Sequence, residues 1–401
     1  MVSGAFTVAE WFLVVQHELL LFAAAFFTLG IIDEFALDCT YLWCRLTGRI
    51  RTPRLDETKF AEIDGLADGP TSKADCLNRL YAALAEDEQR SGVGARMVVL
   101  HDAEDMVDPA ALDLLDQALW HAHFVQLPVL ALPQRHSPWI GSHYSDEFAE
   151  AHGKTLVVRD ALGAAIPGAG VGCAIARGSL GQLAHRQGGK PFAEDSLTED
   201  YELGLKIAQA GGQGRFLRVR GADGRLIATR AFFPSRLDQS IRQKTRWMHG
   251  IALQGWDRLG WDSEPVELWM QLRDRRGPLA AILLVVAYLL VCLVAVGLIL
   301  EQLGLVEPPP TTPLLSVLFW INFVGLAGRF AARACFTARE YGWRQGLLAI
   351  PRTLVSNIVS IMAGRRALAA YVGTLRGAPI VWDKTEHRDH PALVLPGRGA
   401  A

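Results

Sequence analysis

The sequence lacks the features that would assign it to several common classes of protein. Its 40 basic and 42 acidic residues nearly balance, and the basic residues form no single stripe, so no nucleic acid is expected as a partner. The six cysteines have neither the spacing of a metal site nor that of a disulfide framework, which favours a reducing compartment. The sequence also has no internal repeat and no low-complexity tract.

Two nucleotide-binding motifs are excluded by the glycine-rich residues 166–172. This stretch lacks the lysine of a P-loop and the strand-to-helix setting of a dinucleotide fingerprint. Its glycines are expected either to form turns or to let the backbone pass close to a bound sugar.

Long apolar runs are present instead. Half of the residues are hydrophobic and the mean hydropathy is +0.18, which places part of the chain in lipid. Residues 12–32 are long enough to cross a bilayer and lack the features of a cleaved signal peptide, so they are interpreted as a retained anchor. Residues 278–300 and 312–327 predict two further spans. Residues 347–363 contain Pro351 and have basic flanks, which favours an interfacial or re-entrant helix.

The basic residues near these runs predict the domain organisation. Arginines follow the first span, precede the second and follow the third, which places these flanks in the cytoplasm and the N-terminus outside. The predicted parts are a membrane anchor with an interfacial helix (1–54, the helix over 33–46), a cytoplasmic domain (55–272), two spans with the interfacial or re-entrant helix (273–372), and a cytoplasmic tail (373–401).

The middle of the chain has the pattern of an α/β domain. Residues 97–100 predict a buried strand, a helix follows, and residues 125–132 predict a second strand, a rhythm typical of a parallel sheet. Asp102, Glu104 and Asp105 come directly after the first strand, where open α/β sheets bind ligands. These carboxylates are suited to a divalent cation that bridges a diphosphate; the alternative is a solvated acidic turn with a helix N-cap.

Three other positions carry candidate chemistry. Lys73 opens a predicted helix and is either a phosphate ligand or a solvated first-turn lysine. Glu199 and Asp200 open another helix, either as a general base at the mouth of a pocket or as acids beside the Thr198 N-cap.

The third position is a helix that places Gln243, Arg246 and Trp247 on one face, because they are spaced at i, i+3 and i+4. An amide, a bidentate cation and a flat ring can grip a sugar or a diphosphate. The alternative is an interfacial helix with a snorkelling arginine.

In this order, with membrane helices on both sides, the motifs resemble membrane-bound family 2 glycosyltransferases of the cellulose and hyaluronan synthase type, over nearly the whole chain. The resemblance implies a partial GT-A domain inserted between membrane helices of a bacterial inner membrane, and an inverting sugar transfer. It also implies partners: a nucleotide-sugar donor, a glycan or lipid-linked acceptor, membrane lipids, and an outer-membrane or regulatory protein.

The resemblance also implies roles for the residues. Asp102 with Glu104 or Asp105 would hold Mg²⁺ or Mn²⁺ on the donor diphosphate, and Lys73 would reach a phosphate. Asp200, with Glu199 beside it, would be the catalytic carboxylate, and the motif of Gln243, Arg246 and Trp247 would hold the acceptor end and the donor pyrophosphate.

One departure from the family leaves two functions open. Between Pro53 and Gly69 there is room for neither of the two strand–helix units that hold the nucleotide in the family. The chain is therefore expected to be either a glycosyltransferase, with a role in exopolysaccharide synthesis, or a catalytically impaired component that binds glycan or acts as a scaffold in a polysaccharide secretion or phage-receptor system. A transporter is a weaker alternative, because only three spans are predicted.

Overall fold

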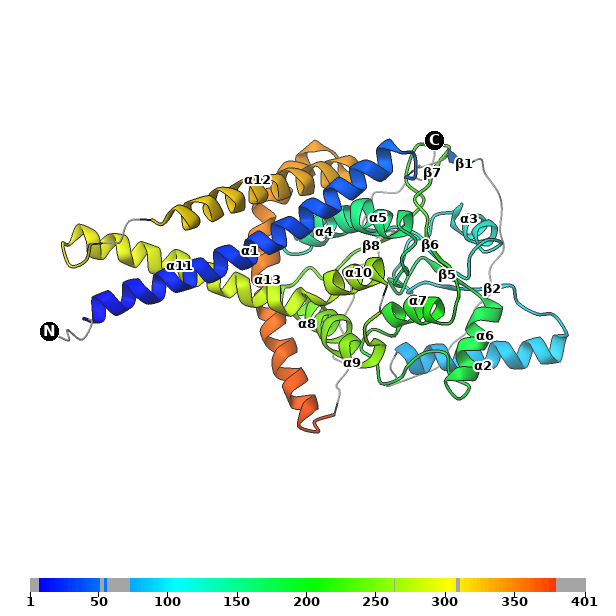
Figure 1. The fold of residues 1–401 in the computed structure, drawn as a ribbon. Helices are drawn as coiled ribbons and strands as arrows, with labels where there is room; N and C mark the ends of the chain where they lie inside the picture. The colour runs from blue at the N-terminus through cyan, green and yellow to red at the C-terminus, as the bar shows by residue number, and fades with distance from the viewer. Residues whose placement is uncertain (1–6, 51–53, 56–72, 263, 308–310, 380–401) are drawn as a thin grey trace.

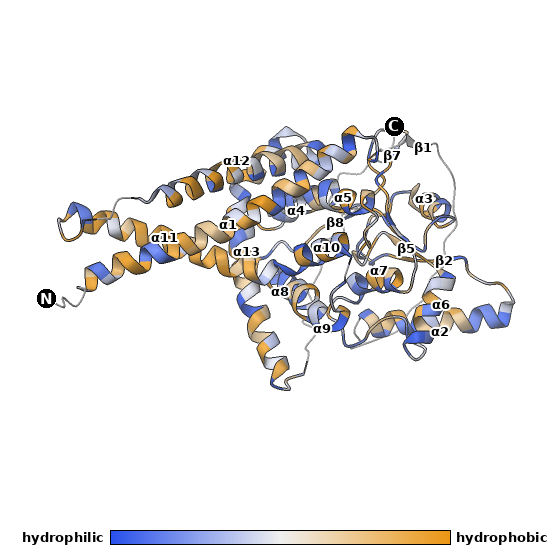
Figure 2. Ribbon diagram, in the orientation of Figure 1, coloured by the Kyte–Doolittle hydropathy of each residue, from blue (hydrophilic) through white to orange (hydrophobic). Residues whose placement is uncertain are grey.

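A computed structural model describes residues 7–50, 54–55, 73–262, 264–307 and 311–379. Four of its helices are long and apolar enough to cross a membrane: α1 Val8–Leu46, α11 Gly277–Gln302, α12 Pro313–Tyr341 and α13 Trp343–Leu375. In Figure 1, α1, α11 and α12 project together from an α/β domain, and α13 crosses their direction. Figure 2 shows that hydrophobic residues dominate the projecting parts of these helices. The arrangement is that of a domain attached to a membrane-spanning bundle.

The remaining helices belong to the domain and its junction with the bundle. They are α2 Lys73–Ser91, α3 Ala111–Ala118, α4 His143–Glu150, the π-helix η1 Ala151–Thr155, α5 Leu156–Ala161, α6 Arg177–Arg186, α7 Glu199–Gln209, α8 Leu237–Trp247, the π-helix η2 Met248–Gln254, α9 Gly255–Leu259 and α10 Pro265–Arg275. The strands are β1 Arg54–Leu55, β2 Met97–Leu100, β3 Phe124–Gln126, β4 Val129–Ala131, β5 Cys173–Ala176, β6 Gly214–Phe216, β7 Arg220–Gly221 and β8 Thr229–Ala231.

Helix α1 is a single helix of 39 residues, so residues 33–46 are not the separate interfacial helix that the sequence predicted. At a rise of 1.5 Å per residue it is about 58 Å long, nearly twice the thickness of a bilayer's hydrocarbon core. Its second half packs on the domain, where Leu37 is fully buried against Val158 and Met270. No glycine or proline lies between Gly30 and the end of the helix at Leu46 to break it.

A network of ion pairs joins α1 to the other projecting helices. Glu34 Oε1 lies 3.0 Å from Arg273 Nη2 and 3.1 Å from Arg329 Nη1. Arg276 pairs with both Glu34 and its neighbour Asp33. These residues come from α1, α10, α12 and the start of α11. Their ion pairs therefore connect the helix bundle to the domain at the junction between the two.

We expect Glu34→Gln to lower the apparent melting temperature of the detergent-solubilised protein. Glu34 is 6% exposed, and its loss leaves the buried Arg273 and Lys154 with one carboxylate fewer. Removing one partner from such a cluster typically costs about 3–5 kcal/mol. Glu18→Gln, an exposed position on the same helix, is the control. Equal melting temperatures for the two variants would show that the network does not hold the bundle together.

The third and fourth long helices differ in how they meet the domain. Helix α12 continues beyond the predicted span 312–327 to Tyr341, where its charged residues face the domain; Arg333 Nε lies 3.1 Å from Glu150 Oε2. Helix α13 is unbroken at Pro351, and its buried Arg352 lies 3.0 Å from Asp146 Oδ2. Helix α13 crosses the other three long helices and packs on α4, α8 and η2. Its predicted location at the membrane interface stays a prediction.

The main sheet is mixed, with the strand order β2-β5-β3-β6. The predicted strand at residues 97–100 is confirmed, but the predicted parallel sheet is wrong in part: β3 and β6 pair in parallel, whereas β2 and β3 do not pair. Strand β5 lies between β2 and β3 and is antiparallel to both, so β2 and β3 run in the same direction without touching. Among the described residues, β2 has a strand neighbour on one side only.

The second predicted strand, over residues 125–132, is divided in two. Strand β3 belongs to the main sheet, whereas β4 pairs with β8 in a separate two-stranded sheet. Pro128 lies between them and has no N–H to donate, which helps to explain the break. The polar ends of β2 and β3 are therefore brought to the same edge of the main sheet, where the candidate site lies.

The core covers both faces of this sheet. One face packs against α6 and α7 through Phe124, Ile175 and Leu203, and the other against α3 through Val125 and Leu115. This two-sided burial fixes the strands whose ends carry the candidate residues.

Candidate active site

The structure brings Lys73 and Asp102 together at the end of β2. Lys73 lies at the start of α2, and its Nζ is 2.5 Å from Asp102 Oδ1 and 3.1 Å from the carbonyl oxygen of Gly170. Gly170 belongs to the glycine-rich loop that precedes β5. Three segments far apart in the sequence thus meet at one edge of the sheet.

The three acids after β2 have different surroundings. Asp105 Oδ2 accepts a hydrogen bond from the backbone N–H of Asp102 at 2.8 Å and lies 3.6 Å from His101 Nδ1. The Asp105 side chain is only 2% exposed, whereas that of Asp102 is 38% exposed. Asp105 therefore holds the turn that presents Asp102, while Glu104 is half-buried beside them.

Glu199 and Asp200 lie at the first turn of α7, next to this pair. Asp200 Oδ1 accepts a hydrogen bond from the backbone N–H of Tyr201 at 2.8 Å. Its Oδ2 faces Gly170, where the backbone has φ +78° and an added Cβ would overlap Oδ2 and lie 3.4 Å from Lys73 Nζ. Because residue 170 is a glycine, the backbone of this loop can lie close to the Asp200 carboxylate.

Burial and charge act in opposite directions on these groups. Burial raises the pKa of Glu199 and of Asp200, and the positive charges of Lys73 and Arg246 oppose that rise. For Lys73, burial is outweighed by the carboxylates of Asp102 and Asp200, which hold its pKa above the ordinary value. Lys73 therefore stays charged, and Asp200 combines a raised proton affinity with a nearby cation that favours its ionised form.

The structural alternative for the start of α7 holds in part: the acids lie in the first turn, but the predicted Thr198 cap is not formed. Thr198 precedes the helix but makes no capping hydrogen bond, and its Oγ1 is buried without a partner in the described part of the chain. Thr198 packs instead against Gly250 of η2, where a Cβ would lie 2.5 Å from Oγ1. The first turn of α7 is thus held by packing against the segment that follows α8.

Helix α8 carries Gln243, Arg246 and Trp247, and of these Arg246 is near enough to the acids of α7 to act on them. Arg246 acts electrostatically on both Glu199 and Asp200. Gln243 is 4% exposed, and its Oε1 has no hydrogen-bond partner among the described residues, as expected of a group that awaits a ligand. The half-buried Trp247 ring packs in an aromatic cluster, with its centroid 6.1–6.2 Å from those of Tyr144, Phe148 and Phe233.

Gln126 is a residue of the site that the sequence analysis missed. Its Nε2 donates to the carbonyl oxygens of Leu127 and Val171 at 2.8 Å, and its Oε1 accepts from the backbone N–H of Ala169 at 2.9 Å. It thereby fixes the glycine-rich loop against the end of β3. A polar residue inside an otherwise apolar strand was the available signal.

Carboxylate oxygens are the ligands that Mg²⁺ and Mn²⁺ prefer, so the donor set here fits such an ion. Among the residues that the structure describes, no three His, Cys, Asp or Glu side chains are grouped to hold a metal by themselves. Asp102, with the half-buried Glu104 beside it, would hold the ion at a donor diphosphate, whereas the inward-turned Asp105 holds the turn.

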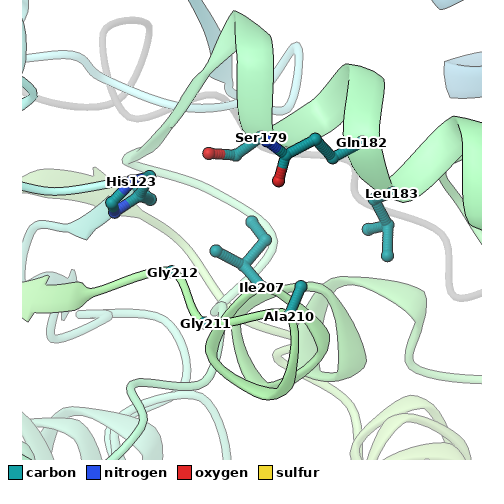
Figure 3. Close-up of a pocket in the computed structure, with 8 residues that line it drawn as sticks. All are labelled: His123, Ser179, Gln182, Leu183, Ile207, Ala210, Gly211 and Gly212. Atoms are coloured by element: carbon teal, nitrogen blue, oxygen red, sulfur yellow. The ribbon is translucent and has the colours of Figure 1, made fainter.

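A separate polar cavity, of about 260 Å³, lies between α6, the end of α7 and the start of β3 (Figure 3). Its lining includes His123, which precedes β3, and Gly212. Because Asp102 follows the end of β2, which runs parallel to β3, this cavity lies at the opposite end of the sheet from the carboxylates. It is not part of the candidate site.

Comparisons with known proteins match the chain to a family model and to curated relatives. Residues 97–300, from β2 to the end of the second span, match the family model "Glycosyl transferase family group 2". The chain is 31% identical over 350 residues to bacteriophage adsorption protein B of Escherichia coli strain K12 and to bacteriophage N4 adsorption protein B of E. coli O157:H7. Each alignment covers 81% of this chain and 46% of the relative, so the chain spans about half the length of these curated relatives. The region matched by the family model contains every candidate residue except Lys73. The chain is a membrane protein of the family 2 glycosyltransferases.

Proposed function

We propose that the protein is an inverting glycosyltransferase that transfers a hexose from a nucleoside-diphosphate donor to a hydroxyl of a glycan or lipid-linked acceptor. The observation that carries the proposal is the convergence of Lys73, Asp102 and Asp200 around the Gly170 backbone, with Arg246 acting electrostatically on Asp200 and its neighbour Glu199. Cations next to carboxylates at a sheet edge suit a reaction in which a diphosphate leaves and a hydroxyl loses its proton.

In the proposed reaction, the acceptor oxygen attacks the anomeric carbon as Asp200 takes the hydroxyl proton. The bond from the anomeric carbon to the donor phosphate breaks, and its electron pair stays on the departing diphosphate. Lys73 and Arg246 stabilise that negative charge, and such preorganised charges commonly supply a large part of the rate enhancement. A bound Mg²⁺ or Mn²⁺ would add further positive charge at the diphosphate.

Helix α8 is proposed to position the acceptor. The unpartnered Oε1 of Gln243 can accept a hydrogen bond from a sugar hydroxyl, and the Trp247 ring offers an apolar face of the kind on which sugars stack. The motif sits where the domain meets α13 and the bundle, which suits an acceptor that approaches along the membrane.

The proposed location is a bacterial inner membrane with the catalytic domain in the cytoplasm. Arg273, Arg276 and Arg329 lie at the level where the projecting helices meet the domain, and cytoplasmic flanks are rich in such residues. The names of the relatives concern phage adsorption, so a product exposed at the cell surface, or an outer-membrane or regulatory partner, is included in the proposal.

Asp102→Asn is expected to remove the metal dependence of donor binding. In a titration of the purified full chain with a panel of nucleotide sugars, Mn²⁺ should tighten binding to the wild type. The variant should lose that gain, about tenfold or more, because a charged ligand to the cation becomes neutral. Asp87→Asn, an exposed acid on α2, is the matched control. Wild-type donor binding that is indifferent to Mn²⁺ would contradict the role of Asp102.

The second candidate function is a non-catalytic, glycan-binding or scaffold component of a polysaccharide secretion or phage-receptor system. The observation that favours it is the edge of β2 that has no strand neighbour in the described residues. The stretch between Pro53 and Gly69 falls mostly outside the described residues, so its predicted lack of nucleotide-binding units stays a prediction. Glycan binding without any nucleotide-sugar binding would favour this function.

A further inference from the structure

A second cavity lies outside the candidate active site, where the end of α1 meets the domain. Its volume is about 620 Å³, within the range of small-molecule sites. It is bounded by the end of α1, η1 and α5, the segment after β6, and the end of α12. None of the candidate site residues lines it. Its walls carry one carboxylate, Asp160, and five arginines: Arg45, Arg49, Arg215, Arg218 and Arg339.

Arg218 is the most informative of these residues. It is 7% exposed, and one of its nitrogens, Nη2, donates to Glu340. Its Nε and Nη1 are buried and have no hydrogen-bond partner among the described residues. Burial lowers the pKa of Arg218 to about 10, so the guanidinium remains charged at neutral pH. Leaving two charged donors unsatisfied is costly, and a movement of the side chain that turns them into the cavity would let a ligand accept from them.

The acids near the cavity are already engaged. Asp160 Oδ1 lies 2.9 Å from Arg215 Nε. Glu340, which pairs with Arg218, also lies 3.5 Å from Arg339 and 3.9 Å from Arg220. The single carboxylate of Glu340 thus faces three guanidinium groups. The walls of the cavity therefore carry an excess of positive charge.

Two further arginines stand at the mouth of the cavity. Arg45 Nη1 donates to the Tyr41 hydroxyl at 3.1 Å, and Arg49 stacks on the Trp43 ring at 4.4 Å. Both contacts orient the arginines without neutralising them. The guanidinium fork matches phosphate oxygens in geometry and in charge.

We propose that this cavity binds a phosphate-bearing organic anion at a site separate from the active centre. Arg218 would bind the phosphate at the inner wall, and Arg45 and Arg49 would close over it at the mouth. The site lies 11 residues along α1 from Glu34, about 17 Å beyond the level of the ion-pair network. A soluble phosphate compound and the phosphate of a lipid headgroup share the required chemistry.

The test uses inorganic pyrophosphate as the probe, titrated without divalent metal into the full chain in phosphatidylcholine nanodiscs. The double variant R45Q/R49Q should weaken binding by about tenfold or more, because charge-assisted hydrogen bonds to phosphate are lost. Both residues are exposed, so the variant is expected to fold. R218Q should weaken binding at least as much. The exposed R90Q is the control for a lost surface charge, and K73M, which removes a cation from the active site, should retain binding.

Nanodiscs that contain phosphatidylglycerol distinguish the two sources of phosphate. Pyrophosphate binding that is unchanged by phosphatidylglycerol assigns a soluble ligand, and binding that phosphatidylglycerol displaces assigns a lipid headgroup. Either result supports the site if the arginine variants weaken it. Pyrophosphate binding that survives both arginine variants, or that K73M abolishes, would overturn the proposal, as would the absence of binding.

Discussion

Asp200→Asn is expected to lower kcat by about 10²–10⁴-fold, the usual contribution of a positioned general base. The asparagine cannot take the acceptor's proton, but it keeps the size of the side chain beside Gly170. Donor affinity should therefore change little. The measurement is release of nucleoside diphosphate from a nucleotide sugar in the presence of acceptor, with donor binding titrated in parallel.

The matched control for this variant is Asp195→Asn. Asp195 lies five residues before Asp200, is largely exposed, and pairs with Arg258 outside the cluster around Gly170. It should retain nearly wild-type turnover. Turnover that survives in Asp200→Asn would remove Asp200 as the base. Glu199, the neighbouring buried carboxylate, would then be the next candidate.

Gly170→Ala is expected to lower turnover by about 100-fold or more, since small displacements of catalytic groups have effects of this size. The new Cβ would overlap Asp200 Oδ2, so the carboxylate would have to move, whereas Lys73 Nζ would lie 3.4 Å from it, in ordinary contact. The left-handed backbone at this position adds a strain of about 1–2 kcal/mol. Turnover and thermal stability should be measured together.

Gly163→Ala separates these two effects. Gly163 has nearly the same backbone angle, φ +74°, but a Cβ there meets nothing within 4 Å. It should show the same loss of stability as Gly170→Ala with turnover retained. If both variants lost turnover equally, backbone strain rather than the contact with Asp200 would explain the result.

The sequence predicted the parts of this site that depend on local pattern. The apolar run at residues 97–100 followed by acids, the helix opened by Lys73, and the shared helical face of Gln243 and Arg246 all rest on spacings of a few residues. Their structures agree with the predictions. The order of these motifs along the chain was also enough to indicate the family.

The parts that the sequence did not predict depend on contacts between distant residues. The insertion of β5 between β2 and β3 joins segments about 75 residues apart, and the bond from Lys73 to Gly170 spans 97 residues. No local periodicity encodes such pairs. The different roles of Asp102 and Asp105 likewise depend on which of the two side chains turns into the protein interior. The length of α1 depends on the domain that covers its second half.

The most direct test of the proposed function is the release of nucleoside diphosphate by the full chain in nanodiscs, measured over a panel of nucleotide sugars with Mn²⁺, Mg²⁺ or EDTA. We predict that at least one donor is turned over with either metal, that EDTA stops the reaction, and that Asp200→Asn is slower by about 10²-fold or more under the same conditions. Release from no donor, with folded protein and each metal present, would contradict glycosyltransferase activity.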